Sequence, residues 1–176
     1  MTRSVVLLRG INLGRARQVG MAELREALTA RGHEGVRTHL RSGNVVLDSP
    51  LDEAALTRDV EEAVRARFGF DVPVVVRTGA ELAAVVAADP LGAVATDPAR
   101  YLVTFLPREP DPERVAALPA ADAGEYRVLG RELFLWLPDG VTTTPVGAWD
   151  WDRLLGVPGT ARNWNTVRKV AALAAV

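Results

Sequence analysis

The 176-residue chain contains no cysteine and only two histidines. The absence of cysteine excludes disulfides, thiolate metal sites and a cysteine nucleophile. His33 and His39 lack the HxxxH or HExxH spacing of a zinc site, and the chain has no GxSxG motif. We therefore expect neither a metal nor a cofactor, and the sequence leaves open whether the protein is an enzyme.

Long apolar runs are also absent, since no stretch reaches the roughly 18 consecutive apolar residues that a membrane span requires. The segment Met1 to Ser4 leads directly into the short apolar run VVLL, which is unlike a signal peptide. With 48% apolar residues and a net charge of −1, the composition is typical of a globular protein. We expect a cytoplasmic monomer or weak homodimer without membrane contact.

Lysine is almost missing, because the chain has twenty arginines and the single lysine Lys169. GC-rich coding alone would produce this bias, so the abundance of arginine says little about phosphate binding. Its distribution says more. Residues 1–50 hold eight arginines and four acids, residues 51–161 hold ten arginines and eighteen acids, and residues 162–176 hold three basic groups and no acid. Both ends of the chain are therefore basic, and the middle is acidic.

Hydrophobic periodicity in the first half predicts the order βαββαβ, which is the ferredoxin-like arrangement of two helices on one face of a four-stranded antiparallel sheet. The hairpin is expected to turn at Ser42-Gly43, and Ser49-Pro50 followed by Asp52 is expected to start the second helix. The expected strands are 4–9, 36–40, 44–47 and 71–77, and the expected helices carry apolar stripes at Met21, Leu24 and Leu28 and at Leu56, Val60, Val64 and Phe68.

The second half repeats this order in a degenerate form. Thr78 and Glu81 form a capping box for a helix that reaches Ala88. A connector (91–99), a strand (101–106), a helix (111–118), a hairpin (125–137) turning at Gly130-Arg131 and a short helix (149–155) follow, and a last helix covers 163–175. We predict an α+β protein of two ferredoxin-like halves, residues 1–88 and 89–176, packed together as one compact unit with a C-terminal helix.

The first candidate motif is Arg9-Gly10-Ile11-Asn12-Leu13-Gly14, which follows a predicted buried strand. A guanidinium, a carboxamide and glycine N–H groups are the components of an anion-binding nest. The spacing fits neither the dinucleotide-binding nor the Walker motif. The alternative is a strand-ending turn in which Asn12 bonds its own backbone and Arg9 pairs with a carboxylate.

The second motif, Arg41-Ser42-Gly43-Asn44, also fits an ordinary hairpin turn. Arg37, His39 and Arg41 fall on one side of this strand, opposite Val36, Thr38 and Leu40. His39 has the pKa range of a general acid or base, although a strand histidine can simply occupy a half-exposed position.

The third motif, residues 160–166, precedes the last helix and contains Arg162, Asn163 and Thr166. Threonine and asparagine are N-cap residues, and the start of a helix presents free N–H groups to anions. The alternative is a plain cap with Trp164 as an anchor in the core.

Together, VVLLRGIN, Met21-Ala22-Glu23-Leu24-Arg25, SGN-V-V and the closing TARNWNTVRK resemble the bacterial family called domain of unknown function 1697, over essentially the whole chain. The resemblance implies two ferredoxin-like halves and no established reaction. Its polar motif positions fall on Arg9, Gly10, Asn12, Gly14, Ser42, Gly43, Asn44, Arg162, Asn163, Trp164 and Thr166. This sequence departs from the family pattern where Gln18 stands near the usual loop lysine and His39-Leu40-Arg41-Ser42 replaces Tyr-Ile-Gln-Ser, which puts ligand contacts from that lysine and tyrosine in doubt.

From these motifs we predict one pocket for a small phosphorylated or carboxylated ligand. Arg9 and Arg162 would clamp the anion, Asn12 and Asn44 would orient it, and His39 is the only candidate proton carrier. The remaining expected ligand-binding residues are Gly10, Gly14, Arg41, Ser42, Asn163 and Thr166. One alternative is a single-stranded nucleic-acid-binding module, which the lack of aromatic residues on the first two strands disfavours. Another is a protein-interaction scaffold in which Trp149, Trp151 and Trp164 form an apolar patch.

Overall fold

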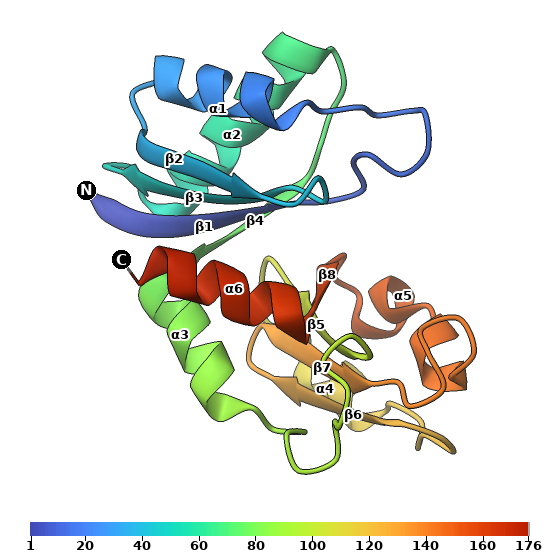
Figure 1. Ribbon diagram of the computed structural model, residues 1–176. Helices are drawn as coiled ribbons and strands as arrows, with labels where there is room; N and C mark the ends of the chain where they lie inside the picture. The colour runs from blue at the N-terminus through green and yellow to red at the C-terminus, as the bar shows by residue number, and fades with distance from the viewer. Residues whose placement is uncertain (176) are drawn as a thin grey trace. The chain divides into compact units, whose positions relative to one another are not determined.

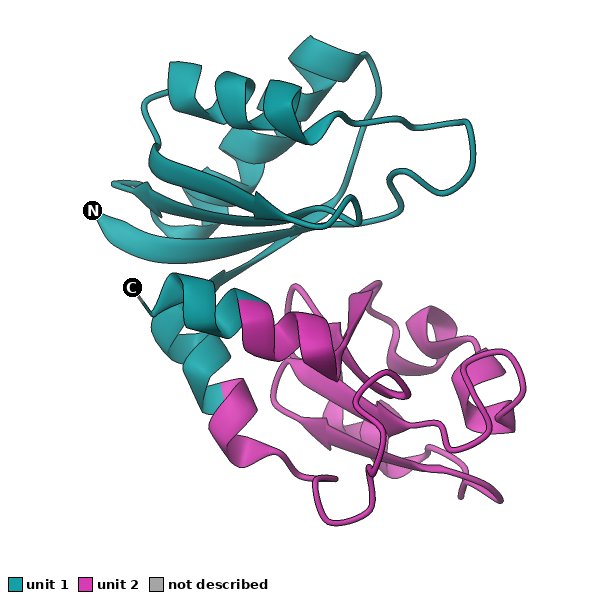
Figure 2. Cartoon of the chain, viewed as in Figure 1, with its two compact units in different colours: residues 1–84, 170–176 teal, residues 85–169 magenta. Residues whose placement is uncertain are grey.

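The computed structural model describes residues 1–175 and contains two compact units (Figure 2). Unit 1 comprises residues 1–84 together with the chain from 170 onward, and unit 2 comprises residues 85–169. Helices α3 (Gly79–Ala88) and α6 (Trp164–Ala174) each contribute residues to both units. The packing of the two predicted halves against each other stays a prediction.

Unit 1 has the predicted ferredoxin-like topology. Its sheet is antiparallel with strand order β2-β3-β1-β4, and α1 and α2 lie on the same face of it (Figure 1). The prediction of a βαββαβ first half is therefore confirmed. The elements are β1 (Thr2–Leu8), α1 (Met21–Ala30), β2 (Glu34–His39), β3 (Asn44–Ser49), α2 (Glu53–Phe68) and β4 (Val74–Thr78).

The central strand β1 is apolar on both faces, as its continuous run VVLL indicates. Val6 and Leu8 belong to the core beneath the two helices, whereas Val5 and Leu7 point to the opposite face and are also buried. The helices supply the rest of the core through the predicted stripes, because Leu24, Leu28, Leu56, Val60 and Val64 are all fully buried. Burial of a leucine or valine side chain stabilises a fold by about 1.5–3 kcal/mol.

One of the two helix starts predicted in unit 1 from capping residues is confirmed, and the other is not. The capping box is confirmed, because the Thr78 N–H donates to Glu81 at 2.8 Å and the Glu81 N–H donates to Thr78 Oγ1 at 3.1 Å. The expected helix start at Ser49-Pro50 was wrong: Ser49 ends β3, and Asp52 caps α2 by accepting from the Ala55 N–H at 2.8 Å. An aspartate at this position bonds the third N–H of the helix, which makes it the stronger cap.

Unit 2 has the same strand order, β6-β7-β5-β8, in a second antiparallel sheet. Its turn between the two hairpin strands falls at Gly130 and Arg131, as predicted. The last strand was missed, since residues 160–163 were assigned to a helix start. Thr160–Asn163 is too short and polar to stand out in the sequence. The elements are β5 (Tyr101–Phe105), α4 (Pro112–Ala116), β6 (Glu125–Leu129), β7 (Glu132–Trp136), the 3₁₀ helix η1 (Pro145–Ala148), α5 (Trp151–Leu155) and β8 (Thr160–Asn163).

Aromatic side chains organise unit 2. Trp151 packs edge-on against Tyr126, with ring centroids 5.2 Å apart, and Trp149 lies 5.4 Å from Trp151. Tyr101 stacks on Trp164 at 4.6 Å, which fixes the first turn of α6 and confirms Trp164 as a buried anchor. Within residues 1–175, no helix combines the length and the apolar character needed to cross a membrane.

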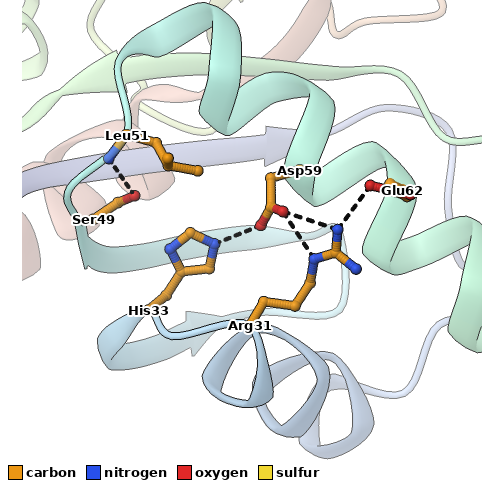
Figure 3. Close-up of polar contacts among 6 residues, drawn as sticks. All are labelled: Arg31, His33, Ser49, Leu51, Asp59 and Glu62. Carbon is orange, nitrogen blue, oxygen red and sulfur yellow. Dashed lines mark hydrogen bonds and ion pairs between the residues drawn. The ribbon is translucent and has the colours of Figure 1, made fainter.

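A polar cluster around Asp59 ties α2 to the segment between α1 and β2 (Figure 3). His33, only 3% exposed, meets Asp59 through its Nε2 at 2.8 Å. The Arg31 guanidinium donates to Asp59 at 2.9 Å and to Glu62 at 2.8 Å. Burial raises the pKa of the Asp59 carboxyl, but the hydrogen bonds from Arg31 and His33 outweigh it and bring the pKa below its ordinary value of 3.8.

We expect Asp59→Asn to destabilise the protein by about 2 kcal/mol at pH 7, because it removes the charged partner of Arg31 and His33. A lowered carboxyl pKa contributes stability above the unfolded-state pKa, and this contribution is lost as the pH falls below about 4 through the folded-state value. The free energy of unfolding, measured by urea denaturation, should therefore be higher for wild type than for Asp59→Asn at pH 7, and this difference should shrink between pH 7 and pH 3.

The matched control is Asp71→Asn, which removes an exposed carboxylate paired with Arg65. Solvent screens such a pair, so the urea midpoint of this variant should be close to that of wild type. Equal urea midpoints for Asp59→Asn and wild type at pH 7 would show that the polar cluster around Asp59 does not stabilise the fold.

Candidate functional site

Two of the three predicted motifs lie together at one end of the unit 1 sheet. The Leu8 N–H at the end of β1 donates to the Gly43 carbonyl at 2.9 Å, and the next N–H, of Arg9, donates to Pro73 at 3.0 Å. The loop of residues 9–20 therefore begins beside the hairpin turn of residues 40–43. We call these two segments together the loop end of unit 1.

Asn12 connects the two segments of the loop end. Its amide group donates to the Val19 carbonyl at 3.0 Å and to the Arg41 carbonyl at 2.7 Å, and its Oδ1 accepts from the Val19 N–H at 2.9 Å. Both amide hydrogens are thus used within the protein. Asn12 positions the loop against the hairpin, and its backbone adopts the left-handed conformation with φ 55°. The alternative of an Asn12 that bonds its own backbone was therefore wrong in its partner, because the side chain bonds the backbone of Val19 and Arg41 instead.

The hairpin turn is longer than predicted, because four residues connect His39 at the end of β2 to Asn44 at the start of β3. Leu40 takes a left-handed φ of 60°. Asn44, only 1% exposed, donates through its amide to the His39 carbonyl at 2.7 Å and to Ser42 Oγ at 3.0 Å. The buried Asn44 side chain therefore holds the turn through the His39 carbonyl and the exposed Ser42.

Gly43 allows the two segments to approach each other. It has a φ of 90°, and a Cβ at this position would lie 2.8 Å from Leu8 Cβ and 2.8 Å from Ile11 Cδ1. Such distances are shorter than van der Waals contact, so no larger residue fits without moving β1 or the loop. Gly10 and Gly14 are also left-handed, at φ 67° and 77°, but face open space.

Arginine side chains surround this framework. The Arg17 guanidinium donates to the Gly10 carbonyl at 3.0 Å and to the Asp71 carbonyl at 2.7 Å, and it lies 5.1 Å from the Phe70 ring centroid. Arg41 donates to Gln18 Oε1 at 2.9 Å. Gln18, which stands near the position of the family's loop lysine, thus places Arg41 by a neutral contact and leaves its charge uncompensated.

Several acids of unit 1 pair with arginines outside the loop end. Arg3 binds Asp48 at 2.6 Å, and this hydrogen bond lowers the pKa of the Asp48 carboxyl. Within residues 1–175, neither Arg15 nor Arg41 forms a salt bridge, and both are exposed. The other salt-bridged arginines of unit 1 are Arg31, Arg65 and Arg67. The loop end therefore carries positive charge that the protein itself does not neutralise.

Arg37 and His39, which were predicted to share one side of a strand with Arg41, lie on β2. Arg37 pairs with Val46 and His39 with Asn44, so both side chains point to the sheet face opposite α1 and α2, whereas Thr38 points toward the helices. Arg37 is exposed and His39 is half-buried. The predicted separation of the two faces is confirmed for these residues, while Arg41 lies in the turn beyond the strand.

The third motif belongs to unit 2 and is built differently from the prediction. Arg162 lies inside β8, is 8% exposed, and donates to Thr160 Oγ1 at 2.7 Å and to the Ala161 carbonyl at 2.9 Å. Burial lowers the pKa of its guanidinium to about 10, so it remains charged at neutral pH. Asn163 caps α6 by accepting from the N–H of Thr166 at 3.0 Å, which confirms the plain-cap alternative for this residue. The predicted convergence of the third motif with the loop end stays a prediction.

Sequence reading missed two features. It did not place His33 in the cluster with Asp59, whose only local signal is a histidine five residues beyond Leu28, the last residue of a helical stripe. It also missed a groove in unit 2 beside Trp149, because the lining residues are scattered over residues 114–156. Within residues 1–175, no group of three or more histidine, cysteine or acidic side chains is arranged to hold a metal ion.

Comparisons with known proteins identify a family and a similar solved structure. The family model described as "Protein of unknown function (DUF1697)" matches residues 1–134, and the chain belongs to this family, as its motifs indicated. A solved structure, the conserved bacterial protein SP0830 from Streptococcus pneumoniae, is similar with a TM-score of 0.77 and 25% identity, covering 100% of this chain and 99% of the other. No curated protein matches.

We expect Gly43→Ala to destabilise the protein by about 2–4 kcal/mol, since it combines left-handed strain with an overlap against Leu8 and Ile11. The control is Gly69→Ala, which has a similar φ of 83° but meets nothing within 4 Å. This variant should cost only about 1 kcal/mol in chemical denaturation. Equal losses for the two variants would mean that close packing at Gly43 is unimportant.

Proposed function

We propose that this protein binds a small anion with two or more phosphate or carboxylate groups at the loop end of unit 1. The observation that carries this proposal is the presence of two exposed arginines on one ordered framework. Within residues 1–175, Arg15 and Arg41 form no salt bridge, and Asn12 fixes the backbone of Arg41 against the loop that carries Arg15. Arg37 and Arg58 are also exposed without a salt bridge in this part of the chain, but they lie outside the loop end, on β2 and α2. Arg9, the clamp residue that the motif predicts, begins the same loop through its backbone.

The framework beneath these arginines supports the proposal because it is already ordered. The Asn12 amide holds Val19 and Arg41, and Arg17 closes the loop onto Gly10 and Asp71. A site whose backbone is fixed before binding loses less conformational entropy when the ligand arrives. The planar guanidinium groups can then donate in pairs to phosphate or carboxylate oxygens.

A ligand with several charges fits this arrangement better than one with a single charge. Solvent screens the exposed arginines, so each contact is individually weak. Several anionic oxygens must therefore engage two or three guanidinium groups together. In this proposal Asn12 and Asn44 position the loops, while Arg9, Arg15 and Arg41 contact the ligand.

Two other functions have less support. Binding of single-stranded nucleic acid on ferredoxin-like sheets uses exposed aromatic side chains on the central strands. In unit 1, β1 and β3 carry none, and in unit 2 Tyr101, Phe105 and Phe134 of β5 and β7 are buried. Catalysis would require a proton carrier, and at the loop end His39 is the only side chain with a suitable pKa range. Its half-buried position on β2 alone defines no reaction.

Isothermal titration calorimetry with inorganic pyrophosphate and with citrate tests the proposal. We expect binding that weakens as salt is raised, and a loss of about tenfold or more in affinity for the double variant Arg15→Ala/Arg41→Ala. The control is Arg58→Ala, which removes an exposed arginine from α2 and should bind like wild type.

Three results would contradict the proposal: no binding of either anion, equal weakening by the double variant and by Arg58→Ala, or tight binding of a uridine oligonucleotide with none of pyrophosphate. The last result would instead favour nucleic-acid recognition. Thermal unfolding of each variant confirms that the fold is intact before affinities are compared.

A further inference from the structure

A groove of about 830 Å³ lies in unit 2, beside α4 and α5. It is separate from the loop end, because all of its lining residues belong to unit 2. Its volume falls in the range of about 300–1,000 Å³ typical of sites for small molecules.

One part of the groove is apolar and built on rigid groups. Leu118 and Pro119 follow α4, Leu154 lies on α5, and the Trp149 ring lies at the groove as well. Trp149 is held by aromatic neighbours, with its ring centroid 5.9 Å from that of Tyr126. A side chain fixed in this way presents a flat apolar surface at little cost in conformational entropy.

The other part of the groove is cationic. The Arg114 guanidinium donates to the Arg153 carbonyl at 3.1 Å and packs beside Gly156, where a Cβ would lie 2.9 Å from its Nε. Within residues 1–175, neither Arg114 nor Arg153 forms a salt bridge. Asp150, the single acid of the groove, is used to cap α5 by accepting from the Arg153 N–H at 3.2 Å.

We propose that this groove binds a small organic acid with a flat apolar body, an aromatic carboxylate being the simplest example. Charge complementarity selects the acid group, since the groove is lined by two arginines and by one aspartate that already serves as a helix cap. The apolar surface of Trp149, Leu118 and Leu154 receives the body of the ligand. The carboxylate pairs with Arg114 and Arg153, whose planar groups match its two oxygens.

Titration calorimetry of the full chain with 2-naphthoate and with the neutral 2-naphthalenemethanol tests this site. The two probes share the ring system and differ in charge. We expect 2-naphthoate to bind at least tenfold more tightly, and the double variant Arg114→Gln/Arg153→Gln to remove this preference. Leu118→Ala should weaken both probes together, because it reduces the apolar surface.

The matched control is Arg127→Gln, an exposed arginine of β6 that does not line the groove. It should retain the affinity and the preference, as should Arg15→Ala/Arg41→Ala, which alters only the loop end. Circular dichroism confirms the fold of each variant, and the Trp149 indole N–H resonance reports directly on occupancy of the groove.

The proposal is overturned if 2-naphthoate does not bind, if both probes bind equally, or if the Arg114→Gln/Arg153→Gln protein keeps the preference for the acid. A loss of naphthoate binding in Arg15→Ala/Arg41→Ala would place that binding at the loop end and would also overturn it.

Discussion

The loop end of unit 1 depends on one side-chain amide. Asn12 reaches from the loop after β1 to the hairpin turn after β2, and it uses both amide hydrogens and its oxygen to do so. Gly43 makes the approach sterically acceptable, because its missing Cβ leaves room for Leu8 and Ile11. Without these two residues, Arg15 and Arg41 would sit on loops with no fixed relation to each other.

The arrangement separates two tasks among polar residues. Asn12, Asn44 and Arg17 bond to backbone carbonyls and hold the loops, while Arg15 and Arg41 are exposed and form no salt bridge within the described chain. This division follows from the cost of burying an unpaired charge, which is far larger than the cost of burying an amide that is fully hydrogen-bonded. The same division explains why a motif rich in Arg, Gly and Asn can serve folding and recognition together.

Unit 2 has the same topology as unit 1 but builds its core from different side chains. Unit 1 buries long aliphatic stripes beneath two helices of 10 and 16 residues, whereas α4 and α5 of unit 2 have 5 residues each. Such short helices bury little surface, and the aromatic cluster around Trp149, Trp151 and Tyr126 compensates for this. The shortness of α4 and α5 also leaves the open groove between Leu118 and Leu154.

Much of the fold was predictable from the sequence, because long elements carry strong periodic patterns. The stripe of Leu56, Val60 and Val64 and the run around Val6 identified α2 and β1, and the order of elements then indicated the topology. Strand β8 was missed because Thr160–Asn163 has four residues and acquires its structure by pairing with β5. Tertiary pairing of this kind leaves no local signal.

The candidate site was predictable in its composition but not in the roles of its residues. Arg9, Asn12, Arg41 and Asn44 were identified from motifs, and the structure brings these four residues to one end of unit 1. The roles of these residues depend on where their side chains point. Asn12 and Asn44 bond to backbone groups, and the spacing of residues in the sequence does not show this. The proximity of the Arg15 loop to Arg41 depends on the contacts of Asn12 with Val19 and Arg41, which the sequence does not show.

The most direct test of anion binding at the loop end is to map backbone amide shifts by NMR while the full chain is titrated with pyrophosphate. We expect the largest shifts in residues 9–20 and 40–43, with those of α2 unchanged. Shifts spread evenly over exposed arginines, or confined to unit 2, would contradict the assignment of the site to the loop end.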